Sequence, residues 1–187
     1  MKILLLILLR FVPMLLFGQT ATGQSNIEYR GSPPIICKFN AGLGIGTKNI
    51  GLLSSIMYSC DNMFYSIRYS MTSEFKLFGP VPEEQVWDLG FIYGTTLRWG
   101  SSSFSYGVGL SYVRQVRRGA LLHSSSGFLE PDQYETIRQT GVGIPIQIEF
   151  TRPLFSFLGG GIIGFADINS VNSFAGIAAV IEIGKLR

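Results

Sequence analysis

The sequence predicts an all-β protein, an eight-stranded antiparallel up-and-down barrel that crosses a membrane. Three features support this fold class. The chain begins with a secretory leader, eight later segments of strand length alternate apolar with small or polar residues, and the connections between them differ in length in an ordered way. A period of two is typical of a β-strand with two different faces. A closed barrel lets such strands cross a bilayer because it leaves no backbone group unpaired.

Residues 1–24 have the pattern of a signal peptide. Lys2 precedes an apolar run, and small and polar residues that suit cleavage follow it. Because Arg10 interrupts the run, no stretch reaches the roughly 20 apolar residues that a membrane-spanning helix needs. An uncleaved anchor is the alternative. Cys37 lies too far downstream to be a lipoprotein cysteine, so we do not expect a lipid anchor at the N-terminus.

The rest of the chain amounts to one domain. We expect residues 25–35 to form a short periplasmic segment and residues 36–187 to form the barrel. Only 14% of the 187 residues are charged, and no segment after the leader has a convincing helical period. The formal net charge of +3 is too small and too scattered to indicate nucleic acid as a partner. We also expect no cofactor and no metal ion.

Eight candidate strands follow one another along the chain. They are residues 36–46, 50–60, 63–73, 86–99, 102–116, 140–151, 153–165 and 173–187. An even number suits a single-chain bacterial barrel, and eight is the smallest common size. The strand at 140–151 has the most regular alternation, with five apolar residues on one face: Val142, Ile144, Ile146, Ile148 and Phe150.

The connections predict which way the barrel is oriented. The second, fourth and sixth are tight, at Asp61-Asn62, Gly100-Ser101 and Arg152-Pro153, whereas the third and fifth, residues 74–85 and 117–139, are long. Because successive strands alternate in direction, the tight turns share one rim with both termini. Short periplasmic turns and long extracellular loops are the usual arrangement of outer-membrane barrels. We therefore expect both termini to be periplasmic.

The strand at 86–99 has the length that a membrane requires. Its apolar face begins at Trp87 and ends at Trp99, which we expect to form part of an aromatic girdle. Twelve steps of about 3.3 Å, tilted by about 40°, span roughly 30 Å of the membrane normal. Two tryptophans in a soluble core are the alternative, but that arrangement does not explain their spacing.

The opposite faces of the strands predict a polar lumen. With the apolar faces outward, six charged residues point inward as a network: Lys38, Arg68, Asp88, Arg98, Glu149 and Glu182. An eight-stranded barrel is just wide enough inside to be filled by side chains. We therefore expect these charges to pair with one another, and we expect a plugged barrel without general pore activity.

A soluble barrel of the lipocalin type is the main structural alternative. Its apolar faces would point inward around a small ligand, and pattern alone does not say which face is inside. The strand at 102–116 argues against it, because its second face is nearly all Gly and Ser. A soluble barrel rarely has an exterior so small and bare.

Cys37 and Cys60 are a candidate disulfide. If the first hairpin closes with a four-residue loop at 47–50, Gly46 opposes Gly51 and the two cysteines oppose each other on one face. An envelope compartment permits oxidation. Two unpaired thiols that act as small apolar residues are the alternative, because the register of a hairpin can shift by a residue or two.

These features resemble those of the small eight-stranded outer-membrane barrels of the outer membrane protein A and X type, particularly the barrel domain family frequent in Bacteroidota. The resemblance covers residues 36–187 and includes FSYGVGLSY at 104–112 and GIPIQIEF at 143–150. It implies a place in the outer membrane of a Gram-negative bacterium, with membrane lipid and other envelope proteins as partners. It also implies a structural, adhesive or complex-associated role. The chain's end, Gly184-Lys185-Leu186-Arg187, lacks the terminal aromatic residue that many such barrels carry.

An enzymatic alternative follows from barrels that hydrolyse acyl chains of lipid A. His123, Ser125 and either Glu130 or Glu135 have a similar order, in which the imidazole would activate the serine and the carboxylate would orient the imidazole. However, they lie in the longest predicted loop, whereas the deacylase pattern lies on strands near the chain's end. We therefore expect a protein that is not an enzyme.

The two long loops are the better candidates for a contact surface. They carry exposed apolar side chains, which are Phe75 and Phe78 in the first loop and Leu121, Leu122, Phe128 and Tyr134 in the second. Such residues indicate contact with a partner protein, a neighbouring subunit or a surface polymer. The alternative is that they fold back over the mouth of the barrel as a lid.

Overall fold

The computed structural model describes residues 36–60, 62–74, 80–124 and 131–184. Several sequence expectations lie outside the described residues: the signal peptide (1–24), the segment at 25–35, Phe75, Phe78, Phe128 and the chain's last three residues. In the part of the chain that the structure describes, no helix is long and apolar enough to cross a membrane.

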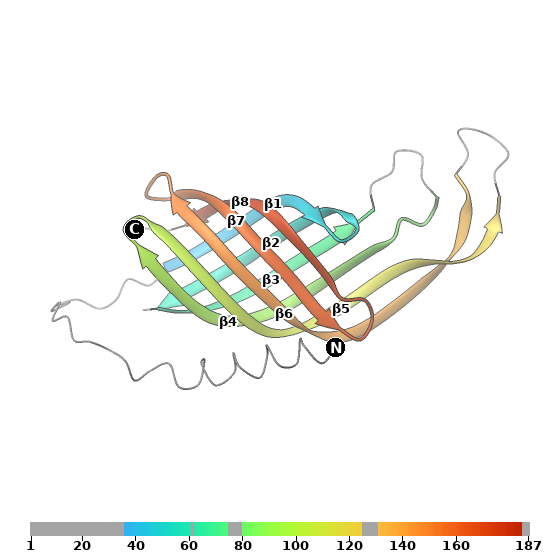
Figure 1. Ribbon diagram of the computed structural model, residues 1–187, viewed down its shortest axis with the longest axis horizontal. Helices are drawn as coiled ribbons and strands as arrows, with labels where there is room; N and C mark the ends of the chain where they lie inside the picture. The colour runs from blue at the N-terminus through green and yellow to red at the C-terminus, as the bar shows by residue number, and fades with distance from the viewer. Residues whose placement is uncertain (1–35, 61, 75–79, 125–130, 185–187) are drawn as a thin grey trace, which may run out of the picture. The chain divides into compact units, whose positions relative to one another are not determined.

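Eight strands form one closed antiparallel barrel, as the sequence predicts (Figure 1). They are β1 (Ile36–Gly46), β2 (Asn49–Cys60), β3 (Met63–Ser73), β4 (Gln85–Trp99), β5 (Ser102–His123), β6 (Gln133–Pro153), β7 (Leu158–Asn169) and β8 (Phe174–Gly184). Each strand pairs with the next one in the chain, and β8 pairs with β1 to close the barrel. The turns β2–β3, β4–β5 and β6–β7 lie at one end, here called the tight-turn rim; the other end is the long-loop rim.

The outer wall of the barrel is apolar. Every strand carries exposed large apolar side chains, among them Leu110 on β5 (74% exposed) and Val142 on β6 (76%). Along β4 and β6 the exposed and buried positions alternate with the period that the sequence predicts. The apolar faces therefore point away from the interior of the barrel.

The interior combines charged, polar and apolar side chains. Large buried side chains share the interior with small ones, because a narrow barrel cannot hold a large residue at every inward position. Met57, Phe64 and Ile92 form one buried apolar cluster. A Cβ at Gly107 would lie 2.8 Å from both Phe64 and Ile92, so the glycine makes room for this cluster.

The fifth connection differs from the prediction of a long loop. The last pairing between β4 and β5 is Gln85 with Val116, and β6 begins to pair with β7 at Gly143. Beyond these points, residues 117–123 pair with residues 133–137 and form a two-stranded arm that projects from the barrel (Figure 1). Most of the predicted loop is therefore strand. Charged residues in this segment favoured the prediction of a loop, although residues 134–137 include Tyr, Thr and Ile, which favour strands.

The sixth connection, between β6 and β7, is longer than the tight turn that the sequence predicts. The strand β6 continues through Arg152 and Pro153, and Pro153 pairs with Gly159. The turn consists of residues 154–157, and the backbone N–H groups of Leu154 and Phe155 both donate to the Leu158 carbonyl, at 2.9 and 2.8 Å. Proline lacks an N–H group and is tolerated at the end of a strand, so it does not mark the turn here.

The register of the first hairpin separates the two cysteines. Gly46 pairs with Asn49 across a two-residue turn, whereas the proposed disulfide needed a four-residue loop. Asn49 has a φ of 108°, in the left-handed region that Asn tolerates better than most residues. The shorter turn shifts the pairing by two residues, so Cys37 opposes Tyr58. Both Cys37 and Cys60 are free, and the disulfide interpretation is wrong.

Candidate functional site

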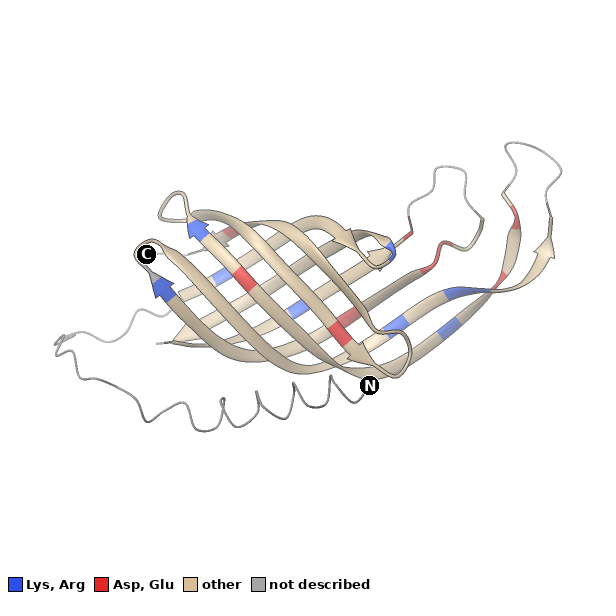
Figure 2. Cartoon of the chain, in the orientation of Figure 1, with Lys and Arg blue, Asp and Glu red and all other residues tan. Residues whose placement is uncertain are grey.

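The first charged cluster in the interior lies close to the tight-turn rim. The Nζ atom of Lys38, on β1, donates hydrogen bonds to Oε1 of Glu149 and to Oε1 of Glu182. All three side chains are buried. Glu182 lies on the neighbouring strand β8, but Glu149 lies on β6, which does not pair with β1. The cluster therefore links strands that the backbone ladder does not join, and Figure 2 shows the charges on these strands.

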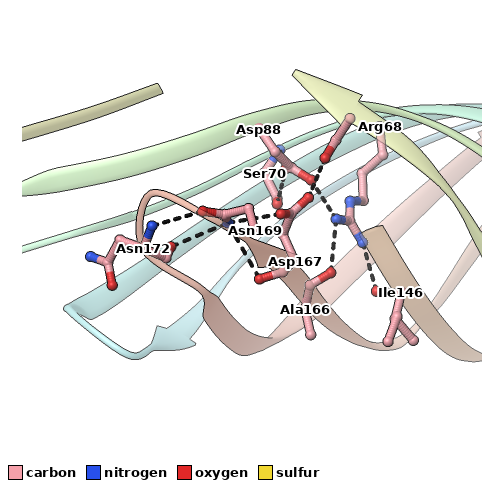
Figure 3. Close-up of polar contacts among 9 residues, drawn as sticks. Arg68, Ser70, Asp88, Ile146, Ala166, Asp167, Asn169 and Asn172 are labelled. Atoms are coloured by element: carbon pink, nitrogen blue, oxygen red, sulfur yellow. Dashed lines mark hydrogen bonds and ion pairs between the residues drawn. The ribbon is translucent and has the colours of Figure 1, made fainter. Parts of the chain in front are cut away.

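The second cluster surrounds Arg68 on β3. Its Nη2 atom donates to Oδ2 of Asp88 at 2.6 Å, and its Nη1 atom donates to the Ile146 carbonyl at 2.8 Å (Figure 3). Nη2 also reaches the Ala166 carbonyl at 3.3 Å. Asp88 accepts a further bond from the Ser70 backbone N–H at 3.1 Å. Because Ile146 and Ala166 lie on β6 and β7, this arginine connects opposite walls of the barrel.

The sequence prediction did not include one charged residue of the barrel interior. Asp167 on β7 is fully buried and accepts hydrogen bonds from the Ser111 hydroxyl and, at 2.8 Å, from the Asn169 side-chain amide. The Asn169 side-chain oxygen accepts from the backbone N–H groups of Val171 and Asn172, at 3.0 and 2.7 Å. The strand was predicted to end at residue 165. Continuing its alternation by four residues places Asp167 on the inner face.

The remaining predicted barrel residues have other positions. Arg98 is exposed and lines an open cavity at the tight-turn rim, so it is not buried beside Lys38 or Arg68. Trp87 lies on the outer face with ring centroids 5.9 Å from those of both Tyr69 and Tyr112. Trp99 ends β4, but its side chain lies outside the described residues.

A balanced ion cluster lies at the long-loop rim, here called the rim ion cluster. Lys48 in the β1–β2 turn donates to Glu84 Oε2 at 2.5 Å, and Arg118 at the base of the arm donates to Glu74 Oε2 at 2.8 Å. Arg118 Nε also lies 4.0 Å from Glu84 Oε1. The cluster joins the first hairpin turn, the β3–β4 connection and the arm. The hydrogen bond from Lys48 lowers the pKa of Glu84; burial opposes this, and the Arg118 backbone N–H adds to the lowering.

We expect the rim ion cluster to weaken in acid. A carboxyl group whose pKa is lowered by folding stabilises the structure above its ordinary pKa, 4.5 for Glu84, and loses that contribution as the pH falls through the lowered value. The protection of the Arg118 amide against hydrogen exchange, relative to its intrinsic exchange rate, should therefore fall in that acidic range. Glu84→Gln should make this exchange fast at every pH, whereas Glu83→Gln, at an exposed neighbour, should behave as the wild type. The same pH dependence of exchange in the wild type and both variants would contradict a role for Glu84 in holding the Arg118 amide.

The β3–β4 connection also supports the arm. The Val81 N–H donates to the Asp132 carbonyl at 2.9 Å, and the Tyr134 N–H donates to the Val81 carbonyl at 2.8 Å. The Arg118 guanidinium lies 6.0 Å from the centre of the Tyr134 ring, a cation–π distance. Leu121 and Leu122 on the arm are 50% and 69% exposed. Among the predicted loop contacts that are described, these two leucines face solvent and Tyr134 packs on the arm.

The described residues of the proposed deacylase triad do not form hydrogen bonds with one another. His123 is exposed at the end of β5, opposite Gln133. Ser125 and Glu130 lie outside the described residues, and no hydrogen bond joins His123 to Glu135 among the described contacts. The described residues also contain no cluster of three or more His, Cys, Asp or Glu residues that could hold a metal ion.

Comparison with solved structures shows barrels of the same fold. The chain is similar to neisserial surface protein A, with 14% identity and a TM-score of 0.53 over 82% of this chain and 98% of that one. It is similar to the N-terminal β-barrel domain of Pseudomonas aeruginosa OprF, with 10% identity and a TM-score of 0.54 over 80% and 96%. It is also similar to Ail, the attachment invasion locus protein of Yersinia pestis, solved with the heparin analogue sucrose octasulfate. That match has 6% identity and a TM-score of 0.51 over 82% and 99%. No protein-family model matches the chain, and no curated protein sequence does.

Proposed function

We propose that this chain is a barrel of a Gram-negative outer membrane. The observation that carries this proposal is the distribution of side chains: exposed large apolar residues cover all eight strands, while Lys38, Arg68, Asp88 and Glu149 are buried inside. A soluble protein rarely exposes so continuous an apolar surface. In a bilayer the same wall contacts the lipid chains, and the closed hydrogen-bond ladder pairs the backbone groups of every strand. The similarity of fold to outer-membrane barrels supports the location.

The tight-turn rim faces the periplasm in this proposal. The connections there are short, and outer-membrane barrels have short periplasmic turns and longer extracellular loops. The arm and the rim ion cluster then lie on the outside of the cell. Both ends of the barrel domain, Ile36 and Gly184, are at the periplasmic rim.

The lumen is plugged in this proposal, and the protein is a structural or interaction component of the envelope without enzymatic activity. Lys38 links β1 to β6 and β8, and Arg68 links β3 to β4, β6 and β7. These two groups lie across the interior, where apolar side chains such as Phe64 and Phe165 are also buried. An eight-stranded barrel filled in this way has no continuous water channel.

The first experiment is fractionation with gel electrophoresis of boiled and unboiled samples. An outer-membrane protein whose band shifts on boiling supports the proposal. A soluble periplasmic protein without the shift contradicts it and favours a carrier of small ligands. Planar bilayer recordings on the purified protein test the plug separately, because conductance of porin size would contradict a closed lumen while leaving the membrane location intact.

The arm is the proposed contact surface for an envelope partner. We expect deletion of residues 119–133 to leave a barrel that shifts on boiling and to remove any protein that co-purifies in mild detergent. The physical reason is that β5 and β6 below the arm keep their pairing with β4 and β7. Loss of the barrel instead would indicate that the arm acts as a lid. The double change Leu121→Ser with Leu122→Ser keeps the arm and tests its apolar side chains alone.

A further inference from the structure

The outward face of β4, β5 and β6 changes from apolar to polar where the arm leaves the barrel. Three successive rows of outward residues cross these strands toward the long-loop rim: Leu89–Tyr112–Val142, Trp87–Arg114–Thr140 and Gln85–Val116–Arg138. The first row consists of exposed apolar residues. The second and third rows introduce hydroxyl and guanidinium groups, so the apolar wall ends between the first row and the third.

Two arginines are neighbours on this face, here called the outer arginine pair. Arg114 opposes Thr140 across the β5–β6 ladder, and Arg138 lies two residues from Thr140 along β6. Residues at such diagonal positions are about 7–8 Å apart, a separation that long side chains bridge. Arg138 is exposed and Arg114 is half-buried, and Figure 2 shows basic residues on both strands at the base of the arm. An anion between the two guanidinium groups would contact both.

The acidic residues of the rim ion cluster do not neutralise the outer arginine pair. Both carboxylates of that cluster are held by Lys48 and Arg118, and the ion pairs described at this rim include neither Arg114 nor Arg138. Glu135 belongs to β6 as well, but its odd position places it on the opposite face of the strand. Two like charges this close repel each other, and an anion that they share removes the repulsion.

The height of the pair matches the headgroup layer of a membrane. A strand rises about 3.3 Å per residue, so a tilt of about 40° leaves about 2.5 Å of height for each residue. Arg114 then lies about 5 Å beyond Tyr112, and Arg138 lies about 10 Å beyond Val142, the last apolar residues of their strands on this face. The headgroup layer of one leaflet begins at the edge of the hydrocarbon core and is about 5–8 Å thick.

An aromatic group lies at the same level. The ring of Trp87, directly opposite Arg114, is 5.9 Å from the rings of both Tyr69 and Tyr112, centre to centre. Tryptophan and tyrosine are enriched where a membrane protein passes from hydrocarbon to headgroups. The aromatic group therefore indicates the same boundary as the change from apolar to polar rows.

We propose that the outer arginine pair binds the phosphate headgroup of a membrane lipid whose acyl chains lie on the apolar wall below. Arginine suits this role because its planar fork donates two parallel hydrogen bonds to phosphate oxygens, and the Thr140 hydroxyl is placed to donate a further one. The pair lies on the outward face directly beyond Tyr112 and Val142, so a lipid gains contacts with both the arginines and the wall, which a soluble phosphate does not. This inference rests on the proposed membrane location.

The test uses Trp87 as a reporter beside Arg114. The chain has two tryptophans, so Trp99→Phe leaves Trp87 as the only one. The purified full chain with this change is reconstituted in phosphatidylcholine vesicles that contain either brominated phosphatidic acid or brominated phosphatidylcholine, which quench a tryptophan that they touch. Phosphatidic acid should quench Trp87 at a lower mole fraction. Arg114→Gln and Arg138→Gln should each reduce this preference by about fivefold, the usual effect of one basic residue at a membrane surface.

Arg117→Gln is the matched control. Arg117 is exposed and lies on the same strand, but it opposes Ile137 on the other face of the arm. This variant should keep the full preference for phosphatidic acid. An equal loss in Arg117→Gln would show that only the overall charge matters and would overturn the site. Loss of the preference in wild-type arginines on adding inorganic phosphate at tens of millimolar would overturn the assignment to a lipid, whereas a preference that persists supports it.

The two brominated lipids also separate this inference from the proposed membrane location. If neither lipid quenches Trp87, the outward face does not meet a bilayer and both proposals fail. If both lipids quench Trp87 equally, with and without the two arginines, the wall lies in the membrane but the outer arginine pair has no lipid ligand, and only this inference fails.

Discussion

Replacing Arg68 by Ala should lower the free energy of unfolding by about 3–5 kcal/mol, the usual cost of removing one partner of a buried ion pair. The Arg68 side chain is fully buried, and Asp88 opposite it is fully buried as well. Without the guanidinium, the Asp88 carboxylate keeps only its bonds from Ser70, and the carbonyl groups of Ile146 and Ala166 lose a donor. Urea unfolding in lipid vesicles, followed by tryptophan fluorescence, measures the change.

Two further variants identify the cause of that loss. Arg152→Ala removes an exposed arginine and should change the free energy of unfolding by less than about 0.5 kcal/mol. The double variant Arg68→Met with Asp88→Asn removes both charges while it retains much of the volume. It should recover a large part of the loss, because replacing a whole buried pair is often close to neutral. A double variant as unstable as Arg68→Ala would show that packing, and not the unpaired charge, dominates.

The outward and inward faces of the strands could be predicted because each strand alternates with a strict period. On β4, Leu89, Phe91 and Tyr93 are exposed, and Asp88 is fully buried, as the pattern indicates. The pattern needs no long-range information, since side chains on a strand point alternately to the two faces. The strand number followed from the same signal, and the structure confirms the closed eight-stranded barrel.

The pairing of residues across the interior could not be predicted in this way. The alternation places Lys38 and Glu149 inside the barrel, but β1 and β6 are not neighbours, and their relative height depends on the stagger of all the strands between them. The register of the first hairpin failed for a related reason. Both a two-residue and a four-residue turn fit the segment Gly46 to Gly51, and the difference of two residues keeps every side chain on its own face.

The arm and the cavity at the tight-turn rim depend on the ends of strands, where sequence patterns are least informative. The arm was predicted as a loop because Arg117, Arg118 and Glu135 interrupt the apolar alternation. Outside the apolar wall a strand has no reason to keep one apolar face, so its alternation fades while its backbone pairing continues. Arg98 was placed inside by its parity, but a position so close to the rim is open to solvent.

Replacing Leu110 by Arg should lower the free energy of unfolding by about 2–4 kcal/mol in lipid vesicles, the cost of a basic side chain on the lipid face at the middle of a bilayer. Leu110 lies near the middle of the part of β5 that pairs with β4, opposite Phe91, and it is 74% exposed. On the surface of a soluble protein, so exposed a leucine could become arginine with a change within about 0.5 kcal/mol. The size of the loss therefore reports whether lipid or water covers this wall.

Leu121→Arg is the matched control, because the same strand carries both leucines. Leu121 is 50% exposed but lies on the arm, beyond the last residue of β5 that pairs with β4. A barrel in a bilayer should tolerate this change with little loss, since the arm lies outside the apolar wall. Equal and small effects of the two substitutions would contradict a membrane-spanning wall. A large effect of Leu121→Arg with a small one of Leu110→Arg would instead indicate that the arm is the buried surface and that its leucines contact another part of the protein.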